Sequence, residues 1–120
     1  MNSLPVIPRP TATLRITDSS FLYNSANFGG AQFSAGTYSV ALVRTTVFDD
    51  NAADCGGALY TLFGKIIDLV QNTFTSNRAT TGGAVFLYSN FAAPGNYTSS
   101  DNVFELNTAD ERGGALYVWM

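Results

Sequence analysis

The fold of this chain is indicated by an eleven-residue segment, Phe48-Asp-Asp-Asn51-Ala-Ala53-Asp-Cys-Gly56-Gly57-Ala58. The same pattern, F-x-x-N-x-A-x-x-G-G-A, also begins at Phe21 and Phe74, and a fourth copy beginning at Phe104 has one extra residue before its glycine pair. The four phenylalanines are 27, 26 and 30 residues apart. Recurrence at a period of about 20 to 50 residues is typical of solenoids, propellers and other arrays.

Strand signals recur inside each period. Mostly apolar residues alternate seven and five positions before each phenylalanine, as Ile67 and Leu69 do before Phe74. Such alternation with period two favours a β-strand. Turn-forming residues such as Gln71 and Asn72 separate these positions from the phenylalanine, and an Ala-x-aromatic unit follows each glycine pair. One period therefore predicts about three short strands joined by turns.

These strands are expected to pair between periods and not within one. Hairpins favour Asn-Gly or Asp-Gly turns, and the chain contains neither dipeptide. Pairing of each strand with its equivalent one period later gives a parallel β-helix. Because parallel crossovers are almost always right-handed, we predict an all-β, right-handed parallel β-helix of about three and a half coils of 26–31 residues. A four-bladed propeller competes less well, since it needs about 40 residues per blade.

Equivalent residues of successive coils stack in such a helix, so each repeated position predicts a ladder. Asparagine tolerates a left-handed backbone and is expected at a corner. The alanine two residues later is expected in a tight turn, and the glycine pair at a bend or a positive φ. The aromatic ladder in the core comprises Phe21, Phe48, Phe74 and Phe104; the asparagine ladder comprises Asn24, Asn51, Asn77 and Asn107; the glycine positions are Gly30, Gly57, Gly83 and Gly114. A second aromatic row contains Phe33, Tyr60, Phe86 and Tyr117, and its side stays open because aliphatic residues lie between.

Length and composition restrict the function. The chain has 120 residues, enough for one domain, with 12% charged residues and a net charge of −3, which disfavours nucleic-acid binding. It has no histidine and a single cysteine, Cys55, so no internal disulfide framework can form. No apolar run is long enough for a membrane-spanning helix. Residues 1–13 are predicted to be a Pro-rich, disordered lead, and residues 14–120 the β-helix.

The paired motifs F-x-x-N and G-G-A-[aliphatic], as in Phe48…Asn51 with Gly56-Gly57-Ala58-Leu59, resemble the repeats of the polymorphic outer membrane proteins. Gln32 departs from the pattern in the first copy, where an aliphatic residue would follow the alanine. The resemblance covers residues 14 to 120. It implies a pectin-lyase-like β-helix and a cell-surface, outer-membrane or extracellular location. It also implies a longer protein with a signal peptide and a barrel, so we expect this chain to be a fragment of a longer solenoid.

An enzyme is the sharper alternative, because many β-helices cleave pectin-like polymers. The candidate carboxylates are Asp49, Asp50, Asp54, Asp110 and Glu111. Asp54 and Asp110 share one repeat position two coils apart, with Thr80 between them, so nothing converges within a coil. We therefore expect no catalysis, no metal and no cofactor. Cys55 is expected to be a small, buried or semi-buried thiol and not a reactive one.

Binding is expected at loops, and the longest insertion is Ser89–Asn96. Of the aromatics near it, Tyr88, Phe91 and Tyr97, Phe91 is the surface candidate and Tyr97 fits a core position. Asn96 heads the N-glycosylation pattern Asn96-Tyr97-Thr98.

The sequence favours a non-catalytic structural or adhesive segment that displays loops to a protein receptor or glycan. The alternatives are part of a carbohydrate-active β-helix whose active residues lie outside this chain, and an inert gene fragment. Open strand edges at both ends predict self-association.

Overall fold

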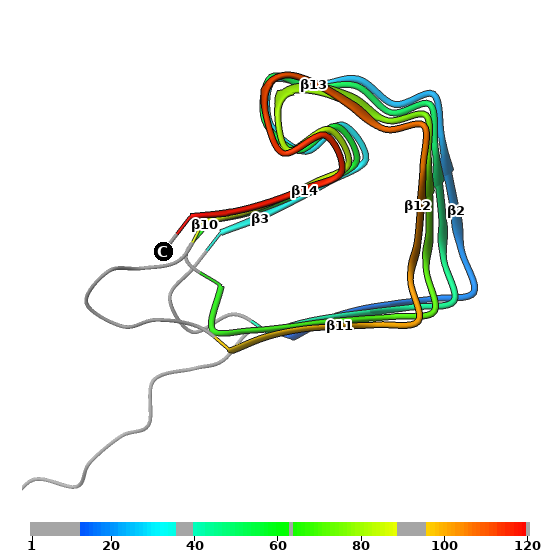
Figure 1. Cartoon of the computed structure of the whole chain (residues 1–120). Helices are drawn as coiled ribbons and strands as arrows, with labels where there is room; N and C mark the ends of the chain where they lie inside the picture. The colour runs from blue at the N-terminus through cyan, green and yellow to red at the C-terminus, as the bar shows by residue number, and fades with distance from the viewer. Residues whose placement is uncertain (1–12, 36–39, 63, 89–95, 120) are drawn as a thin grey trace, which may run out of the picture.

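The computed structural model describes residues 13–35, 40–62, 64–88 and 96–119, and every regular element within them is a β-strand. Viewed along the stack, equivalent strands of successive repeats lie one behind another (Figure 1). All their pairings are parallel, so the described chain is a β-solenoid with no helix. This confirms the predicted all-β class and the parallel pairing of successive coils, whereas the right-handed twist and the number of coils stay predictions.

Three four-stranded sheets form the sides of the solenoid (Figure 1). Sheet 1 contains β1 (Thr13–Thr17), β4 (Val40–Arg44), β7 (Ile66–Val70) and β11 (Asn96–Ser100). Sheet 2 contains β2 (Ser20–Leu22), β5 (Val47–Asp49), β8 (Thr73–Thr75) and β12 (Val103–Glu105). Sheet 4 contains β3 (Gln32–Ala35), β6 (Leu59–Leu62), β10 (Val85–Tyr88) and β14 (Leu116–Trp119).

A fourth strand row corrects the prediction of about three strands per period. Sheet 3 pairs β9 (Arg78–Thr81) with β13 (Thr108–Arg112), where a tight turn was expected. The equivalent segments of the first two repeats join the row through isolated bridges, such as Ser25↔Ala52 and Cys55↔Thr81. We call these segments, residues 25–29, 52–56, 78–82 and 108–113, the arm. In Figure 1 the arm folds back beside sheet 4, and the extra residue of the last repeat is absorbed as a register shift between Ala109 and Arg112.

The corners are also arranged differently from the prediction. The left-handed backbone falls one residue before each asparagine, at Tyr23, Asp50, Ser76 and Leu106, and not at the asparagine itself. The asparagine side chain is thereby placed where it can form hydrogen bonds with neighbouring repeats. In each glycine pair only the first glycine has a positive φ. In the first three pairs the second glycine lies where the next repeat passes too closely for a Cβ atom, as Gly57 does against the Gly83 carbonyl.

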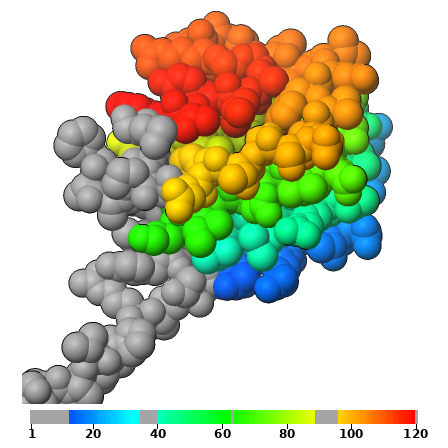
Figure 2. All heavy atoms as spheres, turned by 60° about the horizontal axis from the view of Figure 1, so that its bottom comes forward, coloured from blue at the N-terminus to red at the C-terminus, as the bar shows by residue number. Residues whose placement is uncertain are grey.

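The core lies between sheets 1, 2 and 4. Sheet 1 contributes aliphatic side chains from alternate positions, sheet 2 contributes the phenylalanines, and sheet 4 contributes Leu59, Val85 and Leu87. Figure 2 shows the repeats as layers stacked from the blue to the red end. Because every layer covers the one before it, the two middle repeats are the most deeply buried.

Candidate functional site

The phenylalanine row is a continuous stack inside sheet 2. Centroid separations are 5.2 Å between Phe21 and Phe48, 4.8 Å between Phe48 and Phe74, and 4.9 Å between Phe74 and Phe104, with interplanar angles below 10°. Phe48 and Phe74 are fully buried. Offset stacking of this kind adds about 0.5–1.5 kcal/mol per pair beyond burial. The row therefore stabilises the scaffold and is not available to a ligand.

The asparagine row closes the next corner with hydrogen bonds to the repeats on both sides. The backbone N–H and the Nδ2 of Asn51 both donate to the Oδ1 of Asn77 at 3.0 Å, and Asn24 and Asn77 do the same toward the following repeat. The second Nδ2 hydrogen reaches back to the preceding repeat, as from Asn77 to the Phe48 carbonyl at 3.0 Å. Buried amides are costly unless they are bonded in this way.

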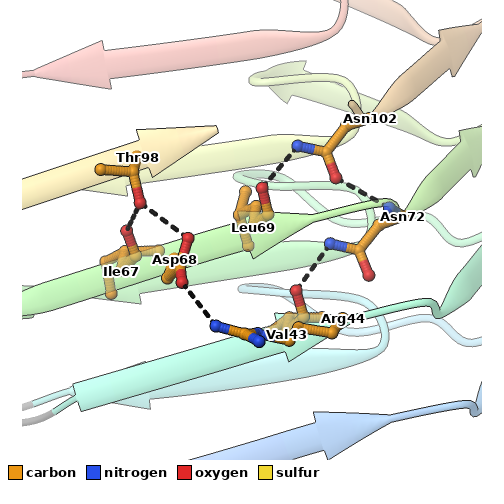
Figure 3. Close-up of polar contacts among 8 residues, drawn as sticks. All are labelled: Val43, Arg44, Ile67, Asp68, Leu69, Asn72, Thr98 and Asn102. Carbon is orange, nitrogen blue, oxygen red and sulfur yellow. Dashed lines mark hydrogen bonds and ion pairs between the residues drawn. The ribbon is translucent and has the colours of Figure 1, made fainter. Parts of the chain in front are cut away.

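A second amide corner joins sheets 1 and 2, and sequence reasoning missed it. The Asn72 N–H donates to Asn102 Oδ1 at 2.8 Å, while Asn72 Nδ2 donates to the Val43 carbonyl at 2.8 Å (Figure 3). The Thr46 N–H donates in turn to Asn72 Oδ1. The first two repeats carry Ser19 and Thr46 at this position, so the sequence showed turn residues but no ladder.

Polar contacts also cross the outer face of sheet 1. Arg44 forms an ion pair with Asp68 at 3.3 Å, and the Thr98 hydroxyl donates to Asp68 at 2.7 Å (Figure 3). The pair is exposed on the arginine side, so it contributes no more than about 1 kcal/mol. These residues brace neighbouring strands.

The second aromatic row lies on the face of sheet 4 that the arm covers. Tyr60 and Phe86 are buried there, whereas Leu59 and Val85 face the core. Centroids are 5.3 Å apart for Phe33 and Tyr60 and 5.0 Å for Tyr60 and Phe86. From the arm, Phe28 packs on Tyr60 at 5.4 Å. The two middle strands of sheet 4 are therefore covered on both faces, and the second aromatic row lies on the side away from the core.

The described residues form a hollow of about 400 Å³ on the arm. Three alanines at equivalent positions line it, namely Ala26, Ala53 and Ala79, and polar residues flank them: Ser25, Asn27, Asp54, Arg78, Thr80 and Asp110. Because the lining comes from all four repeats, the hollow runs along the stack. The structure thus gathers Asp54, Thr80 and Asp110, which the sequence aligned as one row, beside Arg78.

The other candidate carboxylates lie apart from this hollow. Asp49 is half-buried in β5, Asp50 is exposed at a positive-φ corner, and Glu111 is exposed in β13. In the described ranges, no three acidic or cysteine side chains cluster closely enough to hold a metal ion. Among the residues that the structure describes, there is no helix long and apolar enough to cross a membrane.

The predicted binding loop is only partly described. Phe91 lies outside the described residues, and Asn96 is exposed at the start of β11, where its N–H donates to the Lys65 carbonyl at 2.8 Å. Tyr97 packs against the core and its hydroxyl donates to the Gly64 carbonyl at 3.3 Å. Tyr88 contacts Trp119 edge-on at 4.7 Å. Glycosylation at Asn96 stays a prediction.

Cys55 lies in the arm as a free, half-buried thiol. Burial raises the pKa of the Cys55 thiol above its ordinary value, and the Asp54 carboxylate raises it further. The pKa of Tyr60 is raised in the same way, first by burial and then by Cys55 and Tyr88. Thiolate formation is therefore disfavoured here, as in an unreactive structural cysteine.

The raised pKa values predict that iodoacetamide modifies folded Cys55 with a pH midpoint above that of the urea-unfolded chain. The Cys55 thiol and the Tyr60 hydroxyl stabilise the folded state at pH values below their pKa values in the unfolded chain. This stabilisation is lost as the pH rises through their raised pKa values in the folded chain. Asp54→Asn should lower the midpoint only in part, because burial is the larger cause. Equal midpoints for the folded and unfolded chains would contradict this assignment.

Comparison with family models matches residues 45–62 to the Chlamydia polymorphic membrane protein repeat. The matched residues include the second F-x-x-N and G-G-A-Leu pair, of which Phe48 lies in β5 and Leu59 in β6. Comparisons with curated proteins and with solved structures give no match.

Proposed function

We propose that this chain is a non-catalytic, structural and adhesive segment of a cell-surface, outer-membrane or secreted protein. Its coils would follow the right-handed, pectin-lyase-like β-helix, with about three and a half coils. The observation that carries the proposal is the match of residues 45–62 to a membrane-protein repeat, within a rod whose repeated residues are occupied in holding the repeats together.

The scaffold supports display as the mechanism. Stacked rings and amide ladders hold successive repeats at a fixed spacing of about 4.8 Å. Outward positions between these rows then carry side chains at regular intervals along the rod. A rigid element of this kind presents a binding surface that is already ordered, so little conformational entropy is lost when a partner binds.

The hollow on the arm is the part of this surface best suited to a glycan. Asp54, Asp110 and Asn27 offer hydroxyl-binding oxygens, Arg78 offers donors, and the small alanines leave room for a ring. The lining is polar and extends along the rod, so it fits a linear, hydroxyl-rich chain better than an apolar ligand.

This proposal predicts selective loss of glycan binding from the hollow. On an array of purified neutral and acidic glycans, the chain should bind at least one glycan. The double variant Asp54→Ala, Asp110→Ala should reduce that binding signal at least tenfold. Both carboxylates are exposed, so the fold should survive. Glu105→Ala is the matched control, since Glu105 is an exposed acid on sheet 2. Full binding by the double variant would exclude the hollow as the site.

The enzymatic alternative is distinguished by product formation. Incubation of the chain with pectin-like polymers should release neither reducing ends nor unsaturated products. Release that disappears in the Asp54→Ala, Asp110→Ala variant would replace the adhesive proposal with a catalytic one.

A further inference from the structure

The hydrogen bonds at the glycine bend all point along the stack in one direction. Four consecutive N–H groups, those of Gly29, Gly30, Ala31 and Gln32, donate to carbonyls of the next repeat at 2.9–3.2 Å. The Gly56–Leu59 segment repeats this pattern toward the third repeat, and the Gly82–Val85 segment repeats it toward the fourth. In an ordinary parallel ladder, successive N–H groups alternate between the two neighbours. The bend therefore gives the solenoid a donor side and an acceptor side.

The two ends of the described stack differ in consequence. At the red end in Figure 2, the N–H groups of Gly113, Gly114, Ala115 and Leu116 face no acceptor among the described residues. At the blue end, no described donor reaches the Phe28, Gly29 and Ala31 carbonyls, whose equivalents accept such bonds at each internal junction. At the glycine bend, one end therefore presents donors and the other presents acceptors.

The bonds that the asparagine Oδ1 atoms accept have the same polarity. Each Oδ1 from Asn51 to Asn107 accepts two bonds from the repeat before it, whereas the Oδ1 of Asn24 accepts none from the described residues. At the other end, the backbone N–H of Asn107 has no described acceptor. The outer faces of the Phe104 and Phe21 rings complete the match, because each ring stacks on a single ring among the described residues.

We propose that copies of this chain join head to tail, with the Gly113–Leu116 edge of one copy donating to the Phe28–Ala31 edge of the next. The phenylalanine and asparagine rows then continue across the joint. Two like ends cannot form it, because donors would face donors or carbonyls would face carbonyls. A head-to-tail contact that translates along the rod axis does not close, so it produces an open filament.

Glycine geometry provides a variant that blocks only the donor end. A Cβ atom on Gly83 would collide with the Gly114 carbonyl and approach the Thr108 carbonyl oxygen to 2.5 Å. Among the described residues, a Cβ atom on Gly114 meets only the Asn107 oxygen, at an ordinary 3.7 Å. Gly114→Ala therefore fits within one copy, but its methyl group would occupy the place of the Gly30 carbonyl of the next copy.

Ser20→Pro blocks the acceptor end. At this position of the repeat the N–H points toward the preceding repeat, as the bond from Val47 to the Ser19 carbonyl at 3.0 Å shows. Ser20 begins edge strand β2 and its N–H has no described partner, which is a site where proline is tolerated. The proline ring would fill the space of an incoming carbonyl.

Sedimentation velocity of the full chain over a concentration series tests the proposal. The parent should form a ladder of multiples, each variant alone should remain monomeric, and an equimolar mixture should give a 1:1 pair and nothing longer. A monomeric parent, a variant that associates like the parent, or a monomeric mixture would each overturn the proposal. Circular dichroism first verifies folding. If Ser20→Pro does not fold, Gly114→Ala added to the parent should shorten the assemblies, and unchanged lengths would overturn the proposal.

Discussion

Replacement of Phe74 by alanine is expected to remove about 3–5 kcal/mol from the free energy of unfolding. Phe74 is completely buried and stacks on Phe48 at 4.8 Å and on Phe104 at 4.9 Å. Its removal leaves a cavity between two repeats and ends both ring contacts. Because a domain of this size is stabilised by only about 5–15 kcal/mol, the urea midpoint followed by circular dichroism should fall sharply.

Two further variants keep this prediction testable if Phe74→Ala does not fold. Phe74→Leu preserves most of the volume and should cost less than the alanine variant. Phe104→Ala is the positional control, since Phe104 is only partly buried and stacks on one described ring. A loss for Phe104→Ala equal to that for Phe74→Ala would show that the row does not gain stability from being enclosed on both sides.

The solenoid was predictable because the spacing of the repeats determines which strands pair. Phe48 pairs with Phe21 and with Phe74, so the register equals the spacing that the sequence displays. The strand class followed from alternation and from the missing hairpin dipeptides. Handedness has no such signature in the residues and rests on a general rule about crossovers.

The details that escaped prediction are those without a shared residue type. The arm carries Ser25, Ala52 and Arg78 at one bridged position, which have no common strand propensity. Likewise the left-handed corner accepts residues as different as Tyr23 and Leu106. Neighbouring repeats impose these conformations through backbone contacts, so local sequence does not encode them.

Only part of the lining of the hollow was predictable from the sequence. Alignment of the repeats placed Asp54, Thr80 and Asp110 in one row, and the structure lines the hollow with all three. Arg78 belongs to a different row, and only the path of the arm brings it beside them. The candidate site therefore depends on how the arm is arranged, which no residue pattern indicated.

Gly57→Ala and Gly114→Ala should change stability in opposite directions, although both replace the same glycine of the repeat. At Gly57 a Cβ atom would collide with the Gly83 carbonyl and lie 2.7 Å from the backbone nitrogen and oxygen of Arg78. These atoms belong to the next repeat, and the ring and amide rows on either side hold that repeat in place. We expect a loss of more than about 3 kcal/mol, at the upper end for overpacked sites.

At Gly114 the same methyl group meets nothing closer than 3.7 Å, and the φ angle of Gly114 is not positive. Restricting the unfolded chain should then stabilise this variant by about 0.4–1 kcal/mol. Urea unfolding at concentrations where both variants sediment as monomers compares them without a contribution from association. Equal urea midpoints for the two variants would mean that neighbouring repeats can move apart enough to accommodate one methyl group. The glycine would then be retained for its backbone freedom and not for close approach.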